Sequence, residues 1–181
     1  HGFADDKPLL EGDILSIDFG VLYKGFFGDS AITVAVGKLD DDTERLLIAT
    51  RESLEQAIEK AVPNGRLSDI SHAVQSWVEP KGFSVVREFV GHGIGRNLHE
   101  APQIPNYGQA GQGPRLKSGM TLAIEPMINA GRRHTRLNKV DGWTVTTRDG
   151  RLSAQWEHTI CVTDDGCEIL TRRGNETGLV R

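Results

Sequence analysis

Residues 91–102 read GHGIGRNLHEAP, a glycine-rich stretch that carries two histidines. Between residues 43 and 82 the apolar residues recur at helical spacing, whereas before that segment and after it they form short runs typical of strands. The strand patterns cover residues 12–20, 29–36, 83–90, 120–128, 143–147 and 154–162, and CEILT closes a final hairpin. Two strands, two helices and then mostly strands predict an α+β fold, with the helices packed on one face of a largely antiparallel sheet.

The two expected helices have apolar stripes and recognisable ends. The first covers 43–62, with Asp42 or Thr43 as its N-cap, and its inward stripe consists of Leu47, Leu54, Ile58 and Ala61. The second is capped by Ser68 and ends before Gly82, and its inward residues are Ile70, Val74 and Trp77. In the first strand, one face is predicted to carry Leu15, Ile17 and Phe19.

Two familiar sites are excluded for the stretch 91–102. A dinucleotide-binding loop needs glycines at its first, third and sixth positions, and the sixth position here is Arg96 or Leu98. A zinc-protease helix needs His-Glu-x-x-His, whereas HEAPQ ends in Gln103 after a helix-breaking proline. There remains a strand that delivers His92 and His99 into a glycine-bent loop, where the backbone can pass close to a bound group. On the stretch alone, an exposed loop with two solvated histidines stays equally open.

The composition is that of one globular domain. The chain has 181 residues, 38% hydrophobic and 25% charged, with a formal net charge of −4. This charge argues against a nucleic-acid-binding footprint over the whole surface, and no apolar run is long enough to span a bilayer. The two cysteines, Cys161 and Cys167, are interpreted as buried free thiols, not as a disulfide.

Four carboxylates interrupt strand patterns in which strand-forming residues dominate. They are Asp18 in SIDFG, Asp29 in DSAITVAV, Glu125 in LAIEPMI and Glu157 in AQWEHTICV. Aspartate is depleted from strands, and an unpaired buried charge is costly or neutralises itself. No lysine or arginine lies within these runs, so two divalent ions would balance the charge, with a neutral His92 completing a set suited to Mn, Fe, Co or Zn. The alternative is that each acid faces solvent from the polar side of its strand.

The same residues sit in longer segments that resemble a known family. These are HG at 1–2, GDILSID at 12–18, GDSA at 28–31, GFSVVREFVGHGIGRNLHEAP at 82–102, GMTLAIEPMINAG at 119–131 and DGWTVTTRDGRLSAQWEHTICVTDDGCEIL at 141–170. They resemble the type I methionine aminopeptidases, which share the pita-bread fold with prolidases and creatinase. The resemblance covers nearly all of the chain. It implies a single metallopeptidase catalytic domain over 1–181, with a curved, mostly antiparallel sheet and helices on its outer face.

The resemblance also implies roles for individual residues. The implied metal ligands are Asp18, Asp29, His92, Glu125 and Glu157. The implied catalytic residues are His1, His99 and Glu125, with Glu125 moving the proton and His99 contacting the scissile carbonyl. The implied substrate-binding residues are His1, Phe89, Leu98, His99 and Trp143. Ser153 matches a position whose carbonyl helps to hold a monovalent cation, which would join the two divalent ions.

The implied activity is removal of the initiator methionine from nascent chains. In that reaction a metal-bound hydroxide attacks the first peptide carbonyl. The implied partners are peptide N-termini and the ribosome, and the expected form is a cytoplasmic monomer without direct nucleic-acid specificity. Two alternatives stay open: a prolidase-like aminopeptidase of the same fold, and an inactive or weakly active peptide-binding fragment.

One departure from the family concerns the beginning of the chain. Family members have a segment before the HG motif that supplies part of the methionine pocket, whereas this chain begins at His1. We therefore expect a domain that is N-terminally truncated relative to the family. Outside the implied site, we expect a solvated His72, a structural His158 on the sheet face opposite Glu157, and an exposed basic hairpin at GRRHTR, 131–136.

Overall fold

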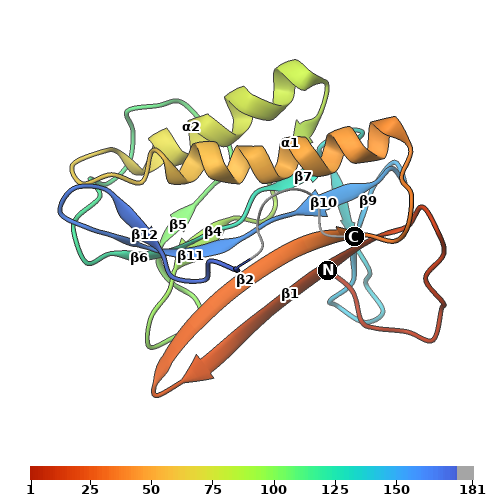
Figure 1. Ribbon diagram of the computed structural model, residues 1–181, viewed down its shortest axis with the longest axis horizontal. Coiled ribbons are helices and arrows are strands. Elements are labelled where there is room, and N and C mark those ends of the chain that lie inside the picture. Colours follow the sequence, from red (N-terminus) through yellow and green to blue (C-terminus); the bar gives the residue numbers. More distant parts are fainter. Residues whose placement is uncertain (175–181) are drawn as a thin grey trace.

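Two helices lie against one side of curved antiparallel strands in the computed structural model, which describes residues 1–174 (Figure 1). The helices are α1 (Asp41–Ile58), α2 (Leu67–Val78) and the short 3-10 helix η1 (Glu79–Lys81). The strands are β1 (Ile14–Tyr23), β2 (Phe26–Ala35), β3 (Ser84–Val85), β4 (Gly91–Gly93), β5 (Glu100–Ile104), β6 (Thr121–Ile124), β7 (Met127–Asn129), β8 (Thr135–Leu137), β9 (Val145–Thr147), β10 (Ser153–Gln155), β11 (His158–Val162) and β12 (Cys167–Ile169). All pairings of these strands are antiparallel, so the predicted α+β class is confirmed.

Helix α1 begins two residues before the expected position. Asp40, not Asp42 or Thr43, is its N-cap, because the Asp40 backbone is extended and its carboxylate accepts the Thr43 N–H at 2.7 Å. The acidic first turn around Asp41 is also favourable at the positive end of a helix dipole. The inward stripe is confirmed, since all four of its predicted members are buried.

The predicted cap of helix α2 is wrong by two residues. Arg66 is the N-cap, and its N–H donates to the Asp69 carboxylate at 2.9 Å. Ser68 lies inside the helix, where its hydroxyl accepts the Gln112 N–H at 2.6 Å and so ties a distant loop to the helix start. Gly82 ends η1 in the left-handed conformation that glycine adopts most readily.

The main core fills the space between the helices and the sheet. It is built from branched aliphatic side chains of α1 and α2 and of the strands beneath them, with Trp156 among them. Its largest fully buried members include Leu46, Leu47, Leu54, Ile70, Leu122, Ile124, Ile128 and Ile160. Each such side chain contributes roughly 1.5–3 kcal/mol by leaving water, so this layer holds the sheet in place.

The β1–β2 hairpin projects from this layer and pairs over its whole length (Figure 1). Ile17 and Phe19 face away from the rest of the described chain, with 43% and 59% of their surfaces exposed. Their neighbours Ser16 and Asp18 therefore point to the other side of the hairpin, where Ser16 Oγ hydrogen-bonds Thr33 Oγ1 at 2.8 Å. The expected strand is confirmed, and its polar face is the one that turns toward the other strands.

Two of the expected strands are interrupted and two are shorter, among them the one for 143–147, which is reduced to β9. The strand predicted for 120–128 is two strands, β6 and β7, separated by Glu125 and Pro126, and the one for 154–162 is β10 and β11, separated by Trp156 and Glu157. A proline has no N–H for the ladder. The two interrupted segments contact each other, because the Trp156 N–H donates to the Pro126 carbonyl at 3.4 Å. The strand predicted for 83–90 is reduced to β3, which pairs only with β7.

His92 lies in a strand, so the expectation that it sits in a glycine-bent loop is wrong. It occupies the centre of β4, between Gly91 and Gly93. A Cβ atom on Gly91 would overlap the Ala123 carbonyl oxygen, and one on Gly93 would overlap the Ala101 carbonyl. These glycines let three strands approach one another closely. Only the second half of the stretch, including His99, forms a bent segment.

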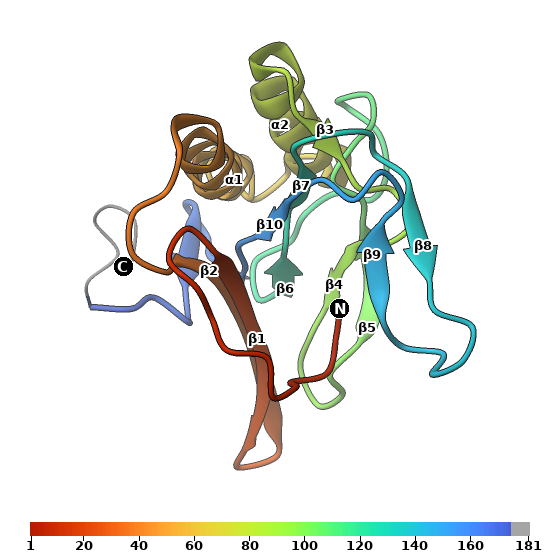
Figure 2. The same cartoon turned by 90° about the vertical axis from the view of Figure 1, so that its right-hand side faces the viewer.

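Figure 2, turned by 90° from Figure 1, shows the helices at the top and the opposite side of the strands below them. The β1–β2 hairpin and the β8–β9 hairpin stand apart there, and the N-terminal segment runs between them. The basic hairpin expected at 131–136 is present as β8 with its partner β9. Cys161 and Cys167 are free thiols, as predicted, but both are half-buried, so the expected full burial is wrong.

Candidate metal centre

Strand register brings three of the predicted ligands onto one face of the five-stranded sheet. His92 and Thr159 both pair with Ala123, one from each side of β6. Residues two apart on a strand share a face, so Glu125 and Glu157 point to the same side as His92. The interruptions at Glu125 and Glu157 leave both carboxylates next to each other at the bend of the sheet.

The β1–β2 hairpin supplies the aspartates. Asp18 pairs with Ala31, so Asp29 lies diagonally across from Asp18 on the same face. The Thr159 hydroxyl accepts the Asp29 N–H at 2.9 Å and donates to the Asp29 carbonyl at 2.8 Å. The Glu157 N–H donates to the Ala31 carbonyl at 2.9 Å. These bonds fix β2 against β11 and hold Asp29 beside Glu157.

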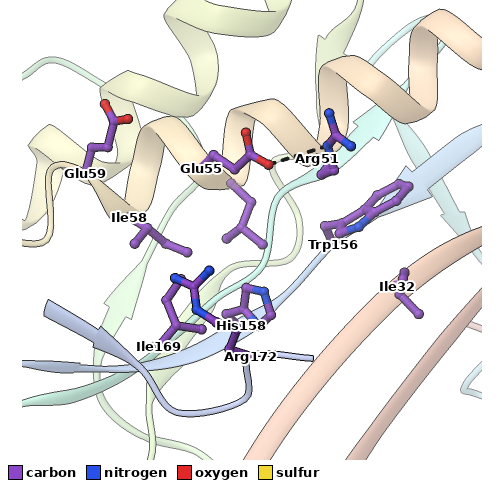
Figure 3. Close-up of a pocket in the computed structure, with 10 residues that line it drawn as sticks. Ile32, Arg51, Glu55, Ile58, Glu59, Trp156, His158, Ile169 and Arg172 are labelled. Atoms are coloured by element: carbon purple, nitrogen blue, oxygen red, sulfur yellow. Dashed lines mark ion pairs between the residues drawn. The ribbon is translucent and has the colours of Figure 1, made fainter. Parts of the chain in front are cut away.

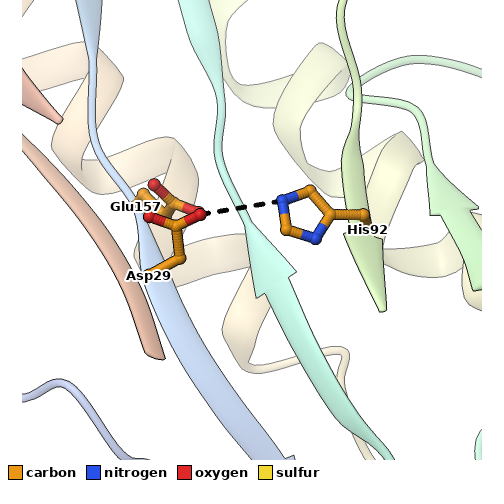
Figure 4. Close-up of side chains that lie close together, drawn as sticks. All are labelled: Asp29, His92 and Glu157. Atoms are coloured by element: carbon orange, nitrogen blue, oxygen red, sulfur yellow. Dashed lines mark ion pairs between the residues drawn. The ribbon is translucent and has the colours of Figure 1, made fainter. Parts of the chain in front are cut away.

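The result is a compact group of ligating atoms. One atom from each of Asp29, His92 and Glu157 lies within 4.8 Å of the others (Figure 4). His92 Nε2 is 3.4 Å from Glu125 Oε1 and 3.9 Å from Asp29 Oδ2. All four side chains are buried, Glu157 almost completely. Asp18 lies at the exposed rim.

Crowding of these carboxylates changes their acidity. Burial, followed by the charges of Asp18 and Asp29, raises the pKa of Glu125 to about 8. Burial, followed by the charge of Glu125 and of both aspartates, raises the pKa of Glu157 to about 10. Partial loss of water and the neighbouring Asp29 raise the pKa of Asp18 as well. Without a cation, the group is therefore disfavoured in its fully ionised form.

A bound cation fits this arrangement. Among residues 1–174, Glu157 Oε1 is one of the few buried polar atoms without a hydrogen-bond partner. Burial lowers the pKa of His92, and its Nδ1 donates to the Gly93 carbonyl at 2.9 Å. The neutral ring then presents the lone pair of Nε2 to the carboxylates, as a metal ligand must. Carboxylate oxygens with one imidazole nitrogen are a donor set for divalent ions.

Among the predicted catalytic and substrate-binding residues, Glu125 and His99 contact His92 of this group. The ring of His99 is 4.4 Å from that of His92, at the exposed side. His1 packs against Phe89 and Trp143, with ring centroids 4.7 and 5.3 Å apart, and its carbonyl accepts the Val145 N–H at 3.0 Å. The structure therefore gathers His1, Phe89 and Trp143 into one aromatic cluster.

A cavity of about 190 Å³ begins at this cluster and reaches Gln155, whose side chain hydrogen-bonds Asp18 and Glu125, although no carboxylate itself lines the cavity. His1 and Phe89 line it, together with Met127, Val145 and Gln155. Trp143 and Leu98 do not line it. Leu98 lies instead over Gly20 of β1, where a Cβ atom would come within 2.9 Å of its Cδ1.

Sequence reasoning missed Gln155 and Thr159. Gln155 Nε2 lies 3.3 Å from Asp18 Oδ2 and 3.4 Å from Glu125 Oε2. Thr159 holds the Asp29 backbone. Each residue lies two positions from Glu157, so strand alternation would have identified both as neighbours on the same face.

A larger cavity, of about 290 Å³, lies on the other side of the strands beneath α1 (Figure 3). His158 lines it with Trp156 and Arg172, beside an ion pair of Arg51 with Glu55 at 3.5 Å. His158 Nδ1 hydrogen-bonds Thr171 Oγ1 at 2.9 Å, as expected for a structural histidine on the face opposite Glu157. His72 is exposed, also as expected, and contacts the Gly108 carbonyl. None of the clustered carboxylates lines this cavity.

Comparison with known proteins agrees with this geometry. Metallopeptidase family M24 matches residues 1–164. The chain belongs to metallopeptidase family M24. Within that family its relatives are methionine aminopeptidases: methionine aminopeptidase 1 of Bacillus subtilis is 54% identical over 95% of this chain and 69% of the relative. The methionine aminopeptidase of Escherichia coli K12 is 52% identical over 98% of this chain and 67% of the relative.

Solved structures of M24 peptidases confirm the pita-bread fold. The crystal structure of methionine aminopeptidase from Rickettsia prowazekii superposes with a TM-score of 0.91 at 50% identity, covering 93% of this chain and 68% of that one. Prolidase from Pyrococcus furiosus gives a TM-score of 0.75 at 25% identity, covering 97% of this chain and 46% of that one. The chain thus resembles methionine aminopeptidases more closely than this prolidase. Within residues 1–174, no helix is long and apolar enough to cross a membrane.

Proposed function

We propose that this M24 chain is a methionine aminopeptidase domain, spanning residues 1–181, that hydrolyses the first peptide bond of a polypeptide beginning with methionine. The observation that carries the proposal is the group formed by Asp29, His92 and Glu157 beside the cavity lined by His1 and Phe89. A hydrolytic centre and a side-chain cavity of limited size are thereby adjacent. A peptide with its N-terminus at the carboxylates could place its first side chain in that cavity.

Two divalent ions are the proposed cofactors, chosen from Co, Mn, Fe or Zn. Their ligands would be Asp18, Asp29, His92, Glu125 and Glu157. Four carboxylates match the charge of two such ions, and the raised pKa values of Glu125 and Glu157 reflect first their burial and then the unbalanced charge of the neighbouring acids. When bound, the ions supply Lewis-acid polarisation of a carbonyl and lower the pKa of a coordinated water.

Side chains of the protein would carry out the proton transfer and stabilise the developing charge. The carboxylate of Glu125, next to His92 and buried, is the proposed proton acceptor from water and donor to the leaving amine. His99 stands at the exposed side of His92, where an imidazole N–H can donate to the scissile carbonyl as negative charge develops on its oxygen.

The aromatic cluster would select the first residue. His1 and Phe89 line the cavity and Trp143 packs against His1 from outside, while Leu98 covers β1. An unbranched thioether suits a cavity of this size, because methionine adapts to irregular apolar space. We further assign a monovalent cation to the backbone near Ser153, which lines the same cavity and hydrogen-bonds the Ile128 carbonyl through its hydroxyl at 3.3 Å.

The proposed partners are the N-termini of nascent chains and the ribosome, with the protein acting in the cytoplasm as a monomer. Residues 131–151, which contain the β8–β9 hairpin, support the ribosome as a partner. In this segment two aspartates accompany six basic residues: Arg132, Arg133, Arg136, Lys139, Arg148 and Arg151. The carboxylate of Asp141 accepts the Trp143 N–H of its own turn, and that of Asp149 accepts the Arg151 N–H of its own turn and the Arg132 N–H from across the hairpin. A positive segment on a chain of net charge −4 suits a phosphate-rich surface.

Peptide cleavage under controlled metal loading tests the activity. The chain is freed of metal with a chelator, reloaded with Mn²⁺ or Co²⁺, and given Met-Ala-Ser, Leu-Ala-Ser and Ala-Pro-Ser peptides. Release of free methionine in the reloaded sample alone is the expected result. Cleavage restricted to the peptide with proline in second position would replace the proposal by a prolidase-like activity. No cleavage of any peptide despite bound metal would leave a peptide-binding domain.

A further inference from the structure

Gln155 is fixed in place independently of its side chain. It is the last residue of β10 and pairs with Met127 of β7. Its N–H donates to Thr33 Oγ1 at 2.9 Å, and its carbonyl accepts the Thr33 hydroxyl at 2.9 Å. Substitutions of the Gln155 side chain therefore leave the backbone contacts between β10 and β2 in place.

The Gln155 amide lies between two carboxylates from different parts of the fold. Its Nε2 is 3.3 Å from Asp18 Oδ2, on the β1–β2 hairpin, and 3.4 Å from Glu125 Oε2, at the end of β6. A primary amide has two N–H donors, so one side chain can donate to both acceptors at once. Gln155 thus bridges the exposed rim of the site and its buried floor.

The Gln155 amide is uncharged, which affects how the two carboxylates can bind a cation. Like charges repel: burial and then the charge of Asp18 raise the pKa of Glu125, while burial and then the charge of Asp29 raise the pKa of Asp18. A lysine or arginine at position 155 would hold both acids but would also neutralise charge that a divalent ion needs. An amide orients the two acids and leaves their negative charge available to a cation.

We propose that Gln155 is a positioning residue that holds Asp18 and Glu125 at a fixed separation and thereby sets the affinity and geometry of divalent-ion binding at this site. The inference rests on the metal centre of the proposed function. Gln155 also lines the cavity with His1 and Phe89. A first side chain in that cavity would therefore contact the residue that orients the acids.

The test replaces the amide without changing its size. Gln155→Met removes both donors, and Gln109→Met makes the same exchange at an exposed loop position as the matched control. Both variants are titrated with Mn²⁺ by calorimetry and loaded with Co²⁺ for absorption spectroscopy. Their melting temperatures are measured without metal. We expect Gln155→Met to raise the Kd of the weaker Mn²⁺ step by about 10- to 100-fold. Its Co²⁺ spectrum should change, and its metal-free melting temperature should match that of the control.

Gln155→Glu provides a second test with a side chain that stays polar. It also removes the donors, so the Co²⁺ spectrum and kcat should change, while its added charge limits the loss of Mn²⁺ affinity. Unaltered Mn²⁺ affinity and Co²⁺ spectrum in both Gln155 variants would overturn the inference, whatever the activity. Mn²⁺ binding by the unsubstituted chain without cleavage of Met-Ala-Ser would contradict the proposed function alone. Absence of Mn²⁺ binding by the unsubstituted chain would overturn both.

Discussion

At the scale of single residues, the strongest expectation concerns Glu125. Its carboxylate is buried, lies 3.4 Å from His92 Nε2 and is the proposed base. Glu125→Gln keeps the shape of the side chain and removes its ability to accept a proton. We expect kcat on Met-Ala-Ser to fall by roughly 10²- to 10⁴-fold, measured at saturating peptide with metal content determined in the same sample. An unchanged kcat at equal metal content would remove Glu125 from the mechanism.

His99 should behave differently from its neighbour His92. Its ring is exposed and contacts His92 without belonging to the compact group of ligating atoms. His99→Ala should lower kcat by roughly 10²-fold, because the lost donor acts on charge that appears in the transition state. Its Mn²⁺ affinity should stay near that of the unsubstituted chain, whereas His92→Ala should lose Mn²⁺. Equal losses of Mn²⁺ in the two variants would make His99 a ligand.

At the scale of elements, the sequence predicted the kinds of element better than their limits. Alternation and helical spacing predicted both helices and the β1–β2 hairpin, because these depend on neighbours in sequence. The interruptions at Glu125 and at Glu157 depend on each other across the sheet, and no local pattern contains that contact. The outward orientation of Ile17 and Phe19 likewise depends on which face of the hairpin meets β11, which apolar content alone misjudges.

The glycines of β4 were noticed in the sequence, but the reason predicted for them was wrong. Their presence suggested a loop near a ligand, whereas Gly91 is required by the close packing of β4 against β6 and β5. Gly91→Ala would push a methyl group into the Ala123 carbonyl and against Ile104. We expect a loss of about 1–3 kcal/mol of folding free energy. That corresponds to roughly 2–4 °C of melting temperature per kcal/mol for a chain of this size.

Thermal unfolding of metal-free protein measures this loss. Gly166→Ala is the matched control, because no atom lies within 4 Å of a Cβ built at that position. The control should melt within about 1 °C of the unsubstituted chain, since a surface change without new contacts is nearly neutral. A Gly91→Ala chain as stable as the control would show that β4 can move aside from β6 without cost.

At the scale of the whole molecule, the site exists only because separate elements converge. The type and number of its acids could be predicted from the sequence, and the resemblance to type I methionine aminopeptidases assigned them to one centre. Their mutual distances, and the part played by Gln155 and Thr159, come from the way β10 and β11 meet the β1–β2 hairpin. Bringing four carboxylates together lowers the free energy of unfolding of the metal-free protein, and the size of this loss depends on pH and on bound metal.

In the metal-free protein this loss of stability can be measured through its dependence on pH, because protonation of the glutamates relieves it. The folded-state pKa values of Glu125, about 8, and Glu157, about 10, exceed the ordinary value of 4.5. The stabilising contribution of the two protonated acids is thus fully present below pH 4.5 and is lost as pH rises through 8 toward 10. The lowered pKa of His92 acts in the opposite direction, but only below about pH 6.5. Between pH 7 and 9 the two glutamates therefore determine the slope at this site.

We predict that the melting temperature of chelator-treated protein falls from pH 7 to pH 9. Saturating Mn²⁺ should raise it and flatten this slope, because the ions replace the protons as counter-charge. Titration of Mn²⁺ into metal-free protein at pH 7.5 in two buffers of different ionisation enthalpy should also reveal proton release. The double variant Glu125→Gln, Glu157→Gln is the control, since its amides cannot ionise and its melting temperature should not follow the same slope. A metal-free protein whose melting temperature is constant from pH 7 to 9, or falls equally in the double variant, would show that the two acids are ionised without a cation.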